Sequence, residues 1–172
     1  KNKELIKIGE VGFRFSISDL ITGKYIVEEI VIKNSICNLE TDKNGINNFE
    51  FWKKSIKIKN ENKNYKKADL QIKKIDIINT SINYENQKEN SSISCKLLNN
   101  RISGELSLEE FNSAIEGKIE IISVRQNKKE IIKNKNIQFN TIAHVSKRDW
   151  IVEEISLEVN DMDISLHGLL KG

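Results

Sequence analysis

Hydrophobic and polar residues alternate along most of the chain. Apolar side chains occupy every second position in residues 11–17, 93–97, 137–139 and 164–166, and Thr141 and Gly168 continue the last two runs. An alternation of this period is typical of a β-strand that buries one face. Polar turn segments separate such runs at residues 41–45, 85–92, 125–129, 146–149 and 160–163. The pattern predicts an all-β chain of about ten strands joined mostly by hairpins.

Few segments favour helix. Residues 47–54 have the composition of one or two helical turns. Residues 107–117 begin with a serine suited to an N-cap, continue with two glutamates and end with a glycine, which together predict a short helix. The basic stretch 53–67 carries no clear period. It is typical of a mobile, solvated connection, although binding to anionic lipid headgroups or nucleic acid stays open.

A charged doublet recurs inside apolar runs. YIVEEI at 25–30 returns as WIVEEI at 150–155, and the longer run VEEIVIKNSICNLE from Val27 matches IKKIDIINTSINYE from Ile72, 45 positions later. A looser third copy covers residues 152–168. Internal similarity of this kind predicts one repeated unit, here a strand, a kink and a second strand.

The doublet itself predicts a β-bulge. Val27 and Ile30 are three residues apart, so an extra residue is needed to keep both on the apolar face, with the charges in solvent. Adjacent strand residues point in opposite directions, so the two glutamates diverge and do not form an acid/base pair. The second copy carries Lys73 and Lys74 at these positions. We interpret the sign of the charge as exchangeable, which predicts that lysines can replace both glutamates with little effect.

A second change of phase follows in each copy. The apolar positions are even-numbered up to Ile32 and odd-numbered from Cys37, so the alternation shifts at residues 34–35; the second copy shifts at 79–80. A bulge or tight corner there would keep both halves apolar on one side. Repeated bends of this sort curl a sheet.

Composition and motifs favour a binding protein over an enzyme. The 172 residues suffice for one domain, and the net charge of +3 gives no strong argument for nucleic acid. Neither His144 nor His167 has a second metal ligand at a suitable spacing, and no catalytic or phosphate-binding motif occurs. Cys37 and Cys95 fit as small apolar strand residues, and a single disulfide between them stays open. We therefore expect no enzymatic activity, no metal and no cofactor.

Three runs resemble the AsmA-like family of bacterial envelope proteins: IVIKNSICNLETDKNGINNF from Ile30, KKIDIINTSINYEN from Lys73, and the closing segment from Phe139 to Gly172. Ser35 stands where the family usually has proline. The resemblance implies a periplasmic sheet curved into a trough with an apolar floor. It also implies an inner-membrane anchor upstream of this chain, and a role in carrying phospholipid and in outer-membrane lipid homeostasis.

We accordingly expect residues 1–172 to form a single all-β domain of a longer, membrane-anchored protein. Its elongated, curved antiparallel sheet with bulges would form a trough or half-pipe that holds phospholipid or another acyl lipid on its concave face. Besides the inner membrane, other envelope proteins are expected partners, and nucleic acid is not. The residues expected on the lipid-binding face are Ile30, Ile32, Cys37, Leu39, Ile75, Ile77, Ile82, Tyr84, Ile155, Leu157, Ile164 and Leu166. The alternative is a structural or adhesive β-protein whose apolar face is closed by self-packing or by a partner.

Overall fold

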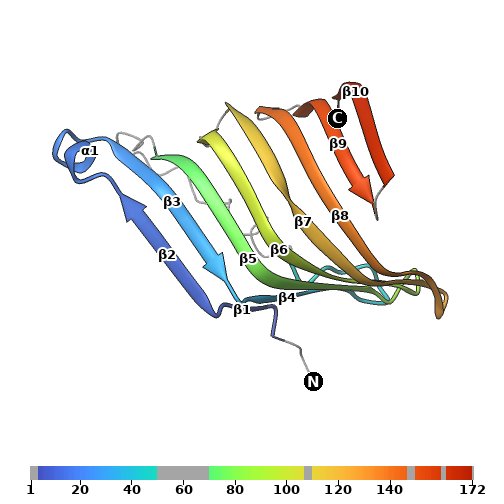
Figure 1. Cartoon of the computed structure of the whole chain (residues 1–172). Coiled ribbons are helices and arrows are strands. Elements are labelled where there is room, and N and C mark those ends of the chain that lie inside the picture. Colours follow the sequence, from blue (N-terminus) through green and yellow to red (C-terminus); the bar gives the residue numbers. More distant parts are fainter. Residues whose placement is uncertain (1–3, 50–69, 107–109, 147–149, 160–161, 172) are drawn as a thin grey trace.

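The computed structural model describes residues 4–49, 70–106, 110–146, 150–159 and 162–171. These residues form one curved, open sheet of ten strands and one short helix (Figure 1). In chain order the elements are β1 (Ile6–Lys7), β2 (Glu10–Phe15), α1 (Ile17–Ile21), β3 (Tyr25–Lys33), β4 (Ile36–Thr41), β5 (Leu70–Asn86), β6 (Ser91–Leu106), β7 (Glu110–Gln126), β8 (Lys129–Ser146), β9 (Trp150–Val159) and β10 (Met162–Lys171). The predicted all-β fold with about ten strands and little helix is confirmed.

The chain crosses the sheet from one edge to the other (Figure 1). From β5 to β10, each strand is antiparallel to the next strand in the chain, as a succession of hairpins requires. The first part differs, because β3 and β4 both lie parallel to β5 and pair with its successive halves. β2 and β1 then add to β3 and β4 in antiparallel fashion.

The long strands change direction partway along their length (Figure 1). Asn34, between β3 and β4, and Asn79, inside β5, both have φ of +52°. These are the positions at which the sequence predicts a corner, and that prediction is confirmed. Asparagine adopts this left-handed region more readily than other side-chain-bearing residues. The two corners adjoin, and Asn79 Nδ2 donates a hydrogen bond of 2.5 Å to Asn34 Oδ1.

The sheet is a single layer. Among the described residues no strand or helix covers either face, and apart from α1 on β3 the elements contact their hydrogen-bonded neighbours. Val27, Leu106 and Ala143 are the buried hydrophobic residues of the described chain, with exposed fractions of 5%, 9% and 6%. The apolar face that the alternation creates is therefore not enclosed by a second layer.

The predicted helix over 107–117 is wrong where the structure describes it. Residues 110–117 belong to β7, because pairing with β6 and β8 along the strand outweighs the local capping pattern. The alternation predicts that Ile17 lies in a strand, but Ile17 begins α1 instead. Ser16 caps this helix, because its Oγ accepts a hydrogen bond from Asp19 N. Most of the 47–54 segment and all of 53–67 lie outside the described residues.

Candidate functional site

The charged doublet sits on a β-bulge, as predicted. Arg14 pairs with Glu29 while Phe15 pairs with Val27, so Glu28 is the extra residue of β3. Val27 and Ile30 consequently lie opposite Phe15 and Phe13, two residues of one face.

The other copies carry an irregularity at the same place. In the third copy, Ile142 pairs with Glu154 and Ala143 with Val152, so the extra residue of β9 is at position 153. In the second copy the register shifts between Ile72 and Lys74, but there the extra residue belongs to the partner strand β6. The bulge is thus a shared feature of the unit, although the strand that carries it varies.

The first two copies lie side by side in parallel, and each residue of the first faces the residue 45 positions later. Eight of the expected lipid-binding residues come together as direct cross-strand pairs: Ile30 with Ile75, Ile32 with Ile77, Cys37 with Ile82, and Leu39 with Tyr84. At the other end of the sheet the remaining four also pair: Ile155 with Leu166 and Leu157 with Ile164.

Residues in the middle of the sheet connect these two groups. Directly paired residues share a face. The register therefore forms one row through Ile30, Ile75, Ile102, Ile115, Thr141 and Ile155, and a second through Ile32, Ile77, Asn100, Gly117, Phe139 and Leu157. Beyond the bend, a third row runs through Cys37, Ile82, Cys95 and Ile121, and a fourth through Leu39, Tyr84, Ile93 and Val124. We call this surface the apolar face.

Ile102, Ile115 and Phe139 are members of the apolar face that the expected set omits, and so is Ile119, which pairs with Leu97 and Ile137 between the second and third rows. Their own alternation could have identified them, because residues 115, 117, 119 and 121 follow the same period of two. The helix prediction over 107–117 obscured that pattern.

The apolar face also contains a buried polar residue. Asn100, 7% exposed, lies in the second row, and its amide donates to the Lys118 carbonyl at 3.2 Å. Its Oδ1 has no hydrogen-bond partner. Gly117 makes room for it, since a Cβ there would stand 2.1 Å from that oxygen.

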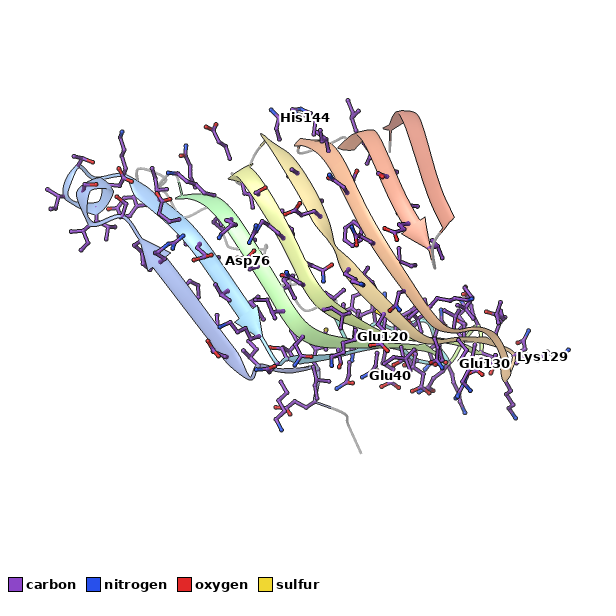
Figure 2. The ribbon with its side chains drawn as sticks, in the orientation of Figure 1. Glu40, Asp76, Glu120, Lys129, Glu130 and His144 are labelled. Atoms are coloured by element: carbon purple, nitrogen blue, oxygen red, sulfur yellow. The ribbon has the colours of Figure 1, made fainter. Side chains whose placement is uncertain are left out.

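The opposite face carries charge. Glu29 accepts from Arg14 at 3.2 Å and also pairs with Lys74. Lys74 reaches Asp76 at 3.3 Å, and Arg101 Nε donates to Asp76 at 2.8 Å. Asp76, labelled on β5 in Figure 2, is only 6% exposed. This polar face therefore holds β2, β3, β5 and β6 together with a chain of ion pairs.

The charges of this network shift each other's pKa values. Burial alone would raise the pKa of the Asp76 carboxyl, but hydrogen bonds from Arg101 and Lys74 outweigh burial and hold that pKa below its usual value. The hydrogen bond to Asp76 raises the pKa of Arg101, and the bond to Glu29 raises that of Lys74. All three groups therefore stay charged.

The contacts of the doublet argue against the interpretation that its sign is exchangeable. Glu28 pairs with Lys73 at 2.8 Å, and Glu29 pairs with Lys74, its counterpart one repeat later. The parallel register places the acidic doublet of one copy against the basic doublet of the next. The charges are complementary partners and not solvent-facing substitutes for each other.

Hollows in the surface also open on the polar face. One, of about 460 Å³, is lined by Arg101, Glu116, Lys118, Gln138, Asn140 and Glu158, among others. A second, of about 230 Å³, lies beyond the bend near Asn38, Asn83 and Ser94, which are linked by hydrogen bonds of 3.0 and 2.9 Å.

The described residues contain no group of three or more metal-ligating side chains. His144, at the upper end of β8 in Figure 2, lies 2.6 Å from Asn112 Oδ1 through its Nδ1. Ile82 separates Cys37 from Cys95 in the register, so an intervening strand puts them about 10 Å apart, too far for a disulfide. Both cysteines are free, and burial raises the pKa of both thiols.

Comparisons with known proteins assign no family to the chain. No protein-family model matches the chain, and no curated protein matches it significantly. Among the described residues, no helix is both long and apolar enough to cross a membrane.

Proposed function

We propose that the chain is a non-enzymatic lipid-binding and lipid-transfer module of the bacterial cell envelope, which holds acyl chains on its apolar face. The observation that carries the proposal is an apolar face that spans the sheet and that no described element covers. A soluble protein rarely leaves a contiguous apolar surface of this extent without a ligand, a membrane or a partner for it.

The chemistry of the apolar face suits an acyl chain. Its side chains are mostly isoleucine, leucine, valine and phenylalanine, which offer burial without directional bonds. An acyl chain of about 16 carbons is roughly 20 Å long and would cross about four strands at a spacing of about 4.8 Å. If half of each methylene is covered, at about 0.8 kcal/mol per fully buried methylene, one chain gains about 6 kcal/mol. Such binding would discriminate weakly between chain types.

The resemblance to AsmA-like envelope proteins supports the setting. Under this proposal the domain lies in the periplasm, belongs to a longer protein anchored in the inner membrane, and supports outer-membrane lipid homeostasis with other envelope proteins. The polar face would then meet water, as its ion pairs and hydrogen-bonded side chains allow.

Lipid extraction from the purified chain tests the proposal. Organic extracts are analysed by mass spectrometry, and binding of a fluorescent fatty acid is titrated. Ile137→Asn changes the apolar face, where Ile137 pairs with Ile119 and Val159. Ile142→Asn is the matched control on the same strand, because Ile142 lies on the polar face. Its row runs through Ala114 and Ser103 to Lys74, each residue being paired with the next.

We expect bound lipid in the extract of the unaltered chain. Ile137→Asn should weaken fatty-acid binding about tenfold, the loss of one well-covered side chain, while Ile142→Asn binds normally. A clean extract with no fatty-acid binding would refute the proposal. It would favour the structural or adhesive alternative, with the apolar face closed by another protein surface.

A further inference from the structure

The tip of the β7–β8 hairpin is the most exposed part of the sheet. Every residue from Arg125 to Asn136 is exposed. The turn is tight, because Gln126 pairs with Lys129 and both residues between them, Asn127 and Lys128, have positive φ, as in a type I′ turn. The described pairing of β9 with β8 begins at Ile137, so residues 129–135 pair with β7 alone. The tip projects beyond the other strands at the lower right of Figure 1.

This tip concentrates positive charge. Residues 125–136 contain five basic side chains and one acidic side chain, a net charge of +4, whereas the whole chain carries only +3. Glu130 is shared between Arg125, at 3.8 Å, and Lys133, at 3.3 Å. Within the described chain, the other three lysines of the tip, Lys128, Lys129 and Lys135, form no ion pair. Among the described residues, this hairpin tip therefore gathers unpaired lysines at one protruding point, where Figure 2 labels Lys129.

The strand arm that carries these lysines also has an exposed apolar side chain. Val124 pairs with Ile132 while Arg125 pairs with Glu130, so Ile131 is an extra, bulged residue of β8. It is 63% exposed, and Ile132 beside it is 39% exposed. A bulge re-aims the side chain that it carries. The structure thus presents an isoleucine at the tip that no neighbouring strand covers.

We propose that the β7–β8 tip docks on an anionic membrane surface, with Lys128, Lys129 and Lys135 against lipid phosphates and Ile131 inserted between headgroups. Basic side chains next to an exposed aliphatic residue match such a surface in both charge and polarity. A nucleic acid fits the tip less well, because residues 125–136 contain a single arginine and no aromatic side chain for stacking. Docking does not depend on lipid uptake by the apolar face, so each can fail without the other.

Vesicle co-sedimentation of the full chain tests the docking. The vesicles are phosphatidylcholine alone or phosphatidylcholine with phosphatidylglycerol. The test variant is Lys128→Gln/Lys129→Gln/Lys135→Gln. Its control, Lys7→Gln/Lys24→Gln/Lys118→Gln, changes three exposed lysines elsewhere, so both variants fall from a net charge of +3 to 0. Circular dichroism checks that both fold.

The unaltered chain should bind the anionic vesicles, bind neutral vesicles much less, and lose binding as salt rises. The tip variant should bind about 100-fold more weakly and Ile131→Asn about tenfold more weakly, while the control variant stays within about threefold. Equal losses in the tip and control variants would overturn the proposal. So would a chain that binds RNA but no vesicle. Ile137→Asn, which changes the apolar face outside the tip, should bind the anionic vesicles normally, and this separates the docking test from that of the apolar face.

Discussion

The left-handed asparagine inside β5 gives the sharpest test of how the sheet bends. Asn79 lies in mid-strand, is exposed, and has φ of +52°. Valine is a much better strand residue than asparagine, so strand preference alone predicts that Asn79→Val stabilises the protein. The geometry predicts the opposite, because a β-branched side chain is strongly disfavoured in the left-handed region.

The expected loss has two parts. An ordinary side chain in the left-handed conformation costs about 1–2 kcal/mol. The hydrogen bond from Asn79 to Asn34, 2.5 Å long, is also lost, at about 0.5–1.5 kcal/mol for a bond of this kind. Asn79→Val should therefore lower the free energy of unfolding by about 2–3 kcal/mol, which for a chain of this size lowers Tm by roughly 5–10 °C.

Urea denaturation of three variants separates the two parts. Asn79→Gly keeps the backbone conformation and loses only the hydrogen bond, so it should cost about 1 kcal/mol. Asn140→Val is the control for strand preference, since Asn140 is an exposed asparagine of β8 without positive φ, and it should be neutral or slightly stabilising. If Asn79→Val is as stable as Asn79→Gly, backbone strain does not hold the bend and the reasoning fails.

Three further outcomes follow from the side-chain contacts. Glu28→Lys should lower Tm by repulsion from Lys73, and adding Lys73→Glu should restore it, as a double-mutant cycle by thermal denaturation would show; no restoration would mean that the 2.8 Å contact is not stabilising. Since the pKa of Asp76 is lower in the folded protein than in the unfolded chain, its contribution is present above about pH 4 and is lost as pH falls through the folded value. Asp76→Asn should therefore flatten the acid limb of the stability curve, and an unchanged limb would contradict this. Cys37 and Cys95 should both titrate as free thiols after unfolding in non-reducing buffer, whereas two missing thiols would contradict the strand order.

Much of the fold could be predicted because its cause is local. Period-two alternation identifies strands wherever one face is apolar, and the three-residue spacing from Val27 to Ile30 identifies the bulge. The corner at Asn34 and Asn79 was also local, since the phase of the alternation changes there. The same reasoning failed for residues 110–117, where capping residues suggest a helix that cross-strand pairing overrides.

The arrangement of the copies could not be predicted from alternation, because alternation is the same in parallel and antiparallel strands. Two successive strand units can form a hairpin or lie in parallel, and only the connection between them decides. The parallel arrangement brings each residue of the first copy beside the residue 45 positions later. That is why the predicted apolar residues meet as like pairs, Ile30 with Ile75 and Ile32 with Ile77.

The same register explains the doublets. In a parallel, in-register pair, identical residues become direct neighbours, which suits isoleucine and asparagine but sets like charges against each other. Asn34 with Asn79 and Asn38 with Asn83 form such ladders, joined by side-chain hydrogen bonds of 2.5 and 3.0 Å. A repeated Glu–Glu doublet would repel its own copy, and the lysines of the second copy turn that repulsion into attraction. Like charges are tolerated elsewhere in the same register, where Glu40 faces Glu85. The exchange of glutamate for lysine between the copies thus favours parallel neighbours, and it argues against the interpretation that the sign of the charge does not matter.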